Sequence, residues 1–97
     1  MNRNRRKALQ QDEDFKFGLE YAFFVAEFRQ TQDTFEALLA RGTVDRGAME
    51  AAAALAPVLQ KMTKKIQEMT PRANSISPGV RARVQAAVDL VAPRKVN

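Results

Sequence analysis

The 97-residue chain contains no cysteine, no histidine and no tryptophan. Without cysteine there is no disulfide framework and no thiol nucleophile, and without both cysteine and histidine the usual zinc ligands are missing. The commonest general base of enzymes is missing as well. Catalysis would have to rest on carboxylates, serine, tyrosine or lysine, so we expect a protein that is not an enzyme and holds no cofactor.

The remaining candidate sites for chemistry are weak. Asp12, Glu13 and Asp14 form an acidic cluster, but it lacks the spaced oxygen ligands and the glycine of a calcium loop. The electrostatics of a helix start explain these acids better. Ser75 and Ser77 have no recognisable base in the sequence, so a capping role is favoured over a nucleophilic one. We therefore predict no catalytic and no metal-binding residues.

Long apolar runs are also scarce. The longest strongly apolar run covers residues 21–26, whereas a helix that spans a bilayer needs roughly 20 such residues. A signal peptide would need an apolar segment after its basic start, and residues 9–14 are polar and acidic instead. We expect a cytoplasmic or particle-associated protein, for example a virion component, with neither a signal peptide nor a membrane span.

The few aromatic residues all lie between Phe15 and Phe35. Most follow an alternating spacing of four and three residues, which keeps them on one face along roughly 30 Å of helix. This first series contains Phe17, Tyr21, Phe24, Phe28, Thr31, Phe35 and Leu38, and a second contains Leu55, Leu59, Met62, Ile66 and Met69. Two such series joined by a short turn predict an antiparallel helical hairpin.

Caps, glycines and prolines predict where the helices begin and end. The first helix covers about 12–41, from an Asp12 cap to Gly42, which is able to take a positive φ; nothing in residues 6–11 opposes an earlier start. Within it, Gly18 marks a close helix contact. The second helix covers about 46–69, with a kink or break at Pro57 and an end before Pro71.

A short third helix follows at about 78–92, because Ser77 and Pro78 form a strong start signal and Pro93 a stop. It places Val80, Val84, Ala87 and Val91 on one face. The predicted fold is all-α and resembles a three-helix bundle. A single helical domain at 9–92 lies between a basic arm at 1–8 and a basic tail at 93–97.

The net charge of +5 is unevenly distributed. Residues 1–7 carry four bases and no acid, residues 8–40 carry seven acids and two bases, and residues 41–97 carry ten bases and four acids. The segments therefore have net charges of +4, −5 and +6, which agree with the total. Such segmentation suits an acidic first helix against basic neighbours, in its own fold or in another copy, or basic ends that contact an anionic partner.

The first helix is apolar on two sides. Opposite the aromatic series lies a second apolar face, formed by Phe15, Leu19, Ala22, Phe23 and Ala26. In one interpretation the third helix covers part of this face and closes a three-helix bundle. In the interpretation we favour, another chain covers it, because monomers seldom expose an apolar patch of this kind. These five residues are the predicted protein interface.

The alternative partner is nucleic acid. Candidate contacts to an anionic partner are the arm residues Arg3, Arg5, Arg6 and Lys7 and the patch Lys61, Lys64, Lys65, Arg72, Arg81 and Arg83. Against this alternative, the aromatic residues lie on the acidic helix instead of alternating with the bases, so no stacking platform is evident. The expected loop of about eight residues before the third helix is also longer than the turn of a helix-turn-helix motif.

The sequence alone therefore predicts a small, non-enzymatic helical interaction subunit. It self-associates or belongs to a larger assembly, and a nucleic-acid-binding accessory protein is the alternative. A virion component or a host-modulating protein of a phage or mobile element is one candidate, which rests on the type of protein and not on a motif.

Overall fold

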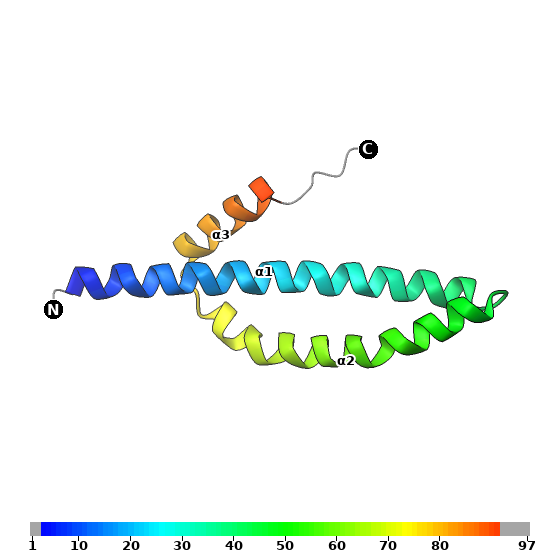
Figure 1. The fold of residues 1–97 in the computed structure, drawn as a ribbon. Coiled ribbons are helices and arrows are strands. Elements are labelled where there is room, and N and C mark those ends of the chain that lie inside the picture. The colour runs from blue at the N-terminus through cyan, green and yellow to red at the C-terminus, as the bar shows by residue number, and fades with distance from the viewer. Residues whose placement is uncertain (1–2, 92–97) are drawn as a thin grey trace. The chain divides into compact units, whose positions relative to one another are not determined.

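The computed structural model describes residues 3–91, which form three helices (Figure 1). These are α1 (Arg3–Arg41), α2 (Arg46–Asn74) and α3 (Pro78–Val91), and the described residues contain no strand. The all-α prediction is confirmed, since α1 and α2 form a hairpin and α3 packs on α1. The predicted tail at 93–97 lies outside the described residues.

The helices belong to two units. One comprises residues 24–69 and is called the hairpin unit below; the other comprises residues 1–23 and 70–97 and is called the terminal unit. Each is described by itself.

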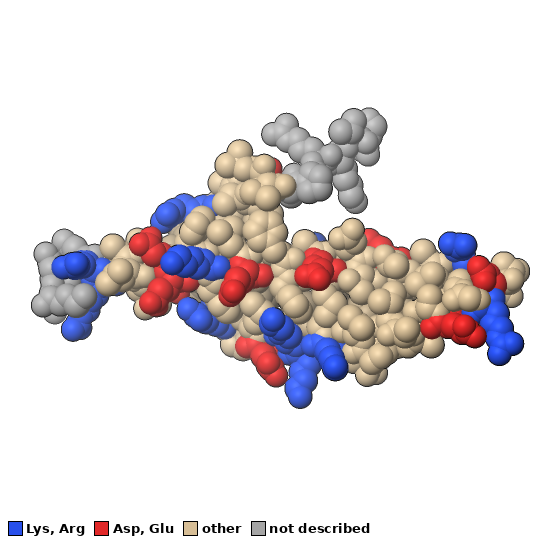
Figure 2. Space-filling model, viewed as in Figure 1, with Lys and Arg blue, Asp and Glu red and all other residues tan. Residues whose placement is uncertain are grey.

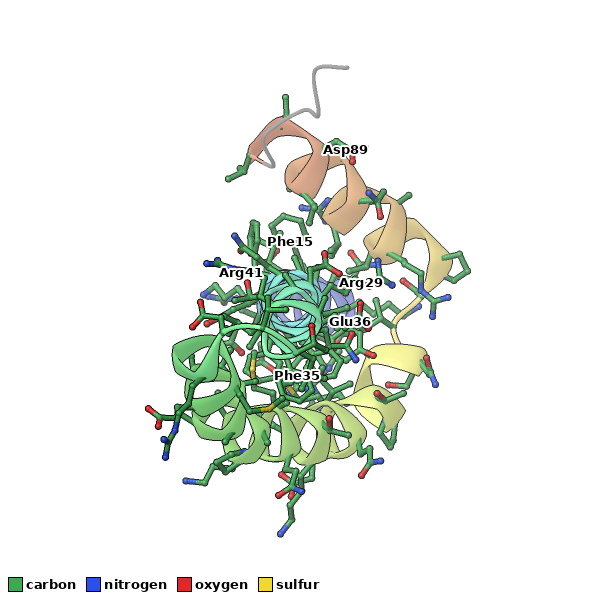
Figure 3. All side chains as sticks on the ribbon, turned by 90° about the vertical axis from the view of Figure 1, so that its right-hand side faces the viewer. Phe15, Arg29, Phe35, Glu36, Arg41 and Asp89 are labelled. Atoms are coloured by element: carbon green, nitrogen blue, oxygen red, sulfur yellow. The ribbon has the colours of Figure 1, made fainter. Side chains whose placement is uncertain are left out.

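In the hairpin unit, α1 returns through a short turn into α2. Asp45 caps α2, because its Oδ1 accepts hydrogen bonds from the amides of Gly47 at 2.9 Å and Ala48 at 3.3 Å. Ala48 and Ala52 are buried near the turn, which the alanine-rich start of α2 makes possible, and Met62 is buried further along the helix. Phe35 points from α1 towards α2 in Figure 3.

Two local expectations in this unit need correction. Gly42 was expected to use its freedom to adopt a positive φ, but no described residue has one; its amide donates to the Leu38 carbonyl at 2.8 Å. At Pro57, where a kink or a break was expected, only the break is ruled out, and α2 continues through this residue with a curved ribbon (Figure 1). Pro57 and Ala53 are both exposed, so water can satisfy the carbonyl that proline cannot pair.

In the terminal unit, α3 packs on the side of α1 that carries Phe15. Ile76, Val80 and Val84 are buried and form the core. Partly buried residues surround them, namely Phe15, Phe17, Leu19, Ala22 and Val88. Figure 3 shows Phe15 pointing from α1 towards α3. Val91, expected on the same face of α3, is exposed.

Gly18 allows this contact. It is buried, and a Cβ atom built on it would lie 2.7 Å from Cγ2 of Val84 and 3.5 Å from Cδ1 of Ile76. The predicted role of Gly18 at a close helix contact is therefore confirmed.

The helix limits differ from the prediction in two places. The start of α1 is Arg3 instead of about residue 12, because a helix extends at little cost through residues that do not oppose it. Residues 3–8 of the predicted arm are thus helical, and Asp12 is not a cap.

The second difference is at the end of α2, which continues past Pro71 to Asn74. Two contacts hold this last turn on α1: the hydroxyls of Tyr21 and Thr70 share a hydrogen bond of 3.0 Å, and the Arg72 guanidinium lies over the Phe17 ring. The connection to α3 is therefore only residues 75–77. The length argument against a helix-turn-helix turn was wrong.

We predict that Gly18→Ala destabilises the protein although alanine favours helix. The added methyl group would have to displace the branched side chain of Val84, and overpacking of this kind costs about 1–3 kcal/mol. Gly79→Ala is the matched control, since nothing lies within 4 Å of a Cβ atom there, and it should leave stability equal or higher. Urea unfolding followed by circular dichroism measures both. Equal stability of the two variants would contradict the close contact.

Candidate interaction surface

Of the five predicted interface residues, three are covered by α3 and two are exposed. Phe15, Leu19 and Ala22 pack against the core of the terminal unit, so α3 covers this part of the face, as in the alternative interpretation of a closed bundle. Phe23 remains 40% exposed. Ala26 is exposed as well and belongs to the hairpin unit.

One side of α1 in the terminal unit is left uncovered. At 100° per residue, Leu9, Lys16, Glu20 and Phe23 lie within about 60° of one another and opposite to Gly18. All four are exposed, whereas Gly18 is buried. We call these four residues the open strip. It carries two apolar side chains, one base and one acid, so a partner that covers it would meet both apolar surface and charge.

Most of the predicted basic patch makes contacts within the protein. Three of its cations lie over phenylalanine rings: Lys65 over Phe24 at 4.8 Å, Arg72 over Phe17 at 4.3 Å and Arg83 over Phe15 at 5.0 Å from the ring centroid. Arg81 donates from Nη2 to the carbonyls of Asn74 and Ile76, both at 3.2 Å. These four side chains stabilise the fold, so they are weaker candidates for contacts to an external anion.

The sequence prediction missed these cation–π contacts because it placed the aromatic residues and the bases in separate segments. The pairing of residues between α1 and α2 could have indicated these contacts. In an antiparallel pair the residue numbers of opposed positions have a constant sum, and Phe17 with Arg72 and Phe24 with Lys65 share one sum.

Other cations remain available. Arg5, Arg6, Lys7, Lys61 and Lys64 are exposed and make no ion pair, hydrogen bond or ring contact with the described residues. The side chain of Arg3 lies outside the described part of the structure. The two ion pairs that the described residues form, Arg41 with Asp45 and Arg46 with Glu50, are both exposed and lie beside the turn of the hairpin.

Other types of site receive no support from residues 3–91. They contain no group of three acidic side chains placed to hold a metal ion, and none of their helices is both long and apolar enough to cross a membrane. No family model, curated protein or solved structure matches the chain.

We predict that Arg72→Gln lowers the free energy of unfolding by about 0.5–1 kcal/mol, the usual contribution of a cation–π contact whose cation is exposed. Lys64→Gln is the control, since Lys64 is exposed and contacts nothing in the described residues. Chemical unfolding at moderate salt measures the difference. If both variants lose the same stability, the ring contact contributes nothing of its own.

Proposed function

We propose that this chain is a non-enzymatic, all-helical interaction subunit. It associates with itself or within a larger complex through the open strip of α1. The observation that carries the proposal is the exposure of Phe23 on the side of α1 that faces away from the buried Gly18.

The free energy that burial of Phe23 can contribute supports a contact that uses several residues. Burying a phenylalanine completely contributes about 1.5–3 kcal/mol, so covering the 40% of Phe23 that is exposed contributes about 1 kcal/mol. That is too little for stable association by itself. Phe23 therefore acts as one aromatic anchor, and the other residues of the open strip must add polar and apolar contacts around it.

The small core supports the same proposal. Among the described residues, only six apolar side chains are buried, and no large one is completely shielded. A chain of this length can bury one modest core. Association with a partner would shield further apolar surface and would add to a stability that the chain's own packing provides only in part.

The test is a single charge on the open strip. Phe23→Asp should lower the mass measured by light scattering towards that of a single chain, 10.9 kDa, because the charge would have to be buried at the contact. Val44→Asp is the control, since Val44 is 91% exposed in the turn of the hairpin unit. A Phe23→Asp protein that assembles exactly as the original does would contradict the proposal.

Nucleic-acid binding is the second candidate, and the free cations Arg5, Arg6 and Lys7 on the first turns of α1 favour it. A helix-turn-helix mode receives less support although the turn before α3 is short. The only two cations of α3 are engaged, Arg81 with carbonyls of the turn and Arg83 with Phe15.

If these three cations contact phosphates, the affinity for labelled DNA or RNA should fall steeply with salt. Replacing all three by glutamine should then reduce the logarithmic slope by about 0.9 per contact on duplex DNA. Arg41→Gln is the control, because Arg41 already pairs with Asp45. A slope that is the same in all three proteins would rule out this role.

A further inference from the structure

The first turns of α1 carry a symmetric arrangement of charge. Leu9 has Arg5 and Arg6 at four and three positions before it, and Asp12 and Glu13 at three and four positions after it. At 100° per residue all five lie within about 60° of the direction of Leu9, on one face. In Figure 2 the blue side chains at the start of α1 are followed by red ones further along the same helix.

Nothing in the described residues contacts this face. All five side chains are exposed, Leu9 to 50%, and none of the four charged ones forms an ion pair with the described residues. The nearest polar contact in this segment joins Gln10 to Asp14, on a different side of the helix.

The electrostatics of the helix itself do not explain the arrangement. Because α1 begins at Arg3, the bases lie at the positive end of the helix dipole, where cations are unfavourable, and the first turn has no acid. The acids lie about three turns into the helix, where the dipole no longer favours them. Arg5 and Arg6 lie six to eight residues before the acids, too far for the pairs between adjacent turns that stabilise single helices. Lys16 lies one turn after the acids, but it forms no ion pair with them in the described residues.

An antiparallel pairing of two such helices satisfies the four charges that surround Leu9. With a twofold axis through Leu9, the Leu9 side chains of the two copies meet. Arg5 then lies beside Asp12 of the second copy and Arg6 beside Glu13. The symmetry repeats both pairs, so four opposite-charge pairs surround one apolar contact. A parallel pairing in the same register would instead oppose like charges.

We infer that this face of α1 binds a second copy of the chain in the antiparallel register centred on Leu9. The inference rests on the proposed function and names the partner for the Leu9 end of the open strip; in this register Glu20 and Phe23 lie beyond the start of the partner's α1. Because exposed ion pairs are weak and screened by salt, the association is reversible, and its dissociation constant should rise at least tenfold between 50 and 500 mM salt.

Single cysteines test the register, because the natural chain has none. In the antiparallel pair, Leu9→Cys brings the two thiols to the twofold axis and should give a disulfide-linked dimer on mild oxidation. Glu20→Cys is the control on the same strip. Its two thiols would lie roughly 33 Å apart along the helix axis, so it should stay unlinked. Disulfide-linked dimers of both variants, or of neither, would contradict the antiparallel register centred on Leu9.

Charge reversal tests the partner. Arg5→Glu with Arg6→Glu should weaken self-association at least tenfold, and so should Asp12→Lys with Glu13→Lys. A chain with all four substitutions should recover it, because the symmetry is restored. If the four-residue variant stays as weak as either parent, the inference is wrong.

The two proposals can fail separately. Assembly that responds to Phe23→Asp but not to these reversals would preserve the proposed function and end this inference. A single-chain mass for the natural protein at every concentration, with no linkage of Leu9→Cys, would also end the inference. The proposed function would then depend on a different partner.

Discussion

The close approach of α3 to α1 at Gly18 is the constraint on which the terminal unit depends. A Cβ atom at this position would lie 2.7 Å from Cγ2 of Val84, closer than carbon atoms that are not bonded approach one another. Glycine therefore lets the two helices lie in contact. Phe15, Leu19 and Ala22 then surround the small core of α3. Since α3 is the short helix that packs on this side, the opposite side of α1 keeps its exposed leucine and phenylalanine.

Charge has two roles in this protein. In each unit, cations of α2 or α3 lie over phenylalanine rings of α1, where they shield apolar surface and gain a favourable contact. The cations of the first turns of α1 lie over no aromatic ring, and two acids follow them further along the same exposed face. The first group explains why so basic a sequence can fold around aromatic residues, and the second provides the complementarity for a partner.

The fold class could be predicted from the sequence because the four-and-three spacing of apolar residues is a strong helical signal. Ser77 was recognisable as the start of a helix, and it acts as such, because its hydroxyl accepts a hydrogen bond from the amide of Val80. The errors arose where one residue favoured the end of a helix but the residues around it allow the helix to continue. Asp12 looked like a cap although nothing stops a helix before it, and Pro71 looked like a stop although Thr70 and Arg72 hold the next turn on α1.

The candidate surface was predictable only in part. The sequence showed that α1 is apolar on two sides, but not that α3 would cover Phe15 and leave Phe23, because that depends on where two remote segments pack. The wrong start of α1 also hid the symmetry about Leu9, since acids placed at a helix start seemed already explained.

The central claim is that the side of α1 facing away from Gly18 binds a second copy of the chain around Leu9. Amide NMR spectra recorded over a dilution series test it most directly. The account predicts concentration-dependent shifts at Arg6, Leu9 and Asp12, with constant signals at Val44 and in the core of α3. Spectra that do not change with concentration, or changes confined to the turn of the hairpin, would contradict it.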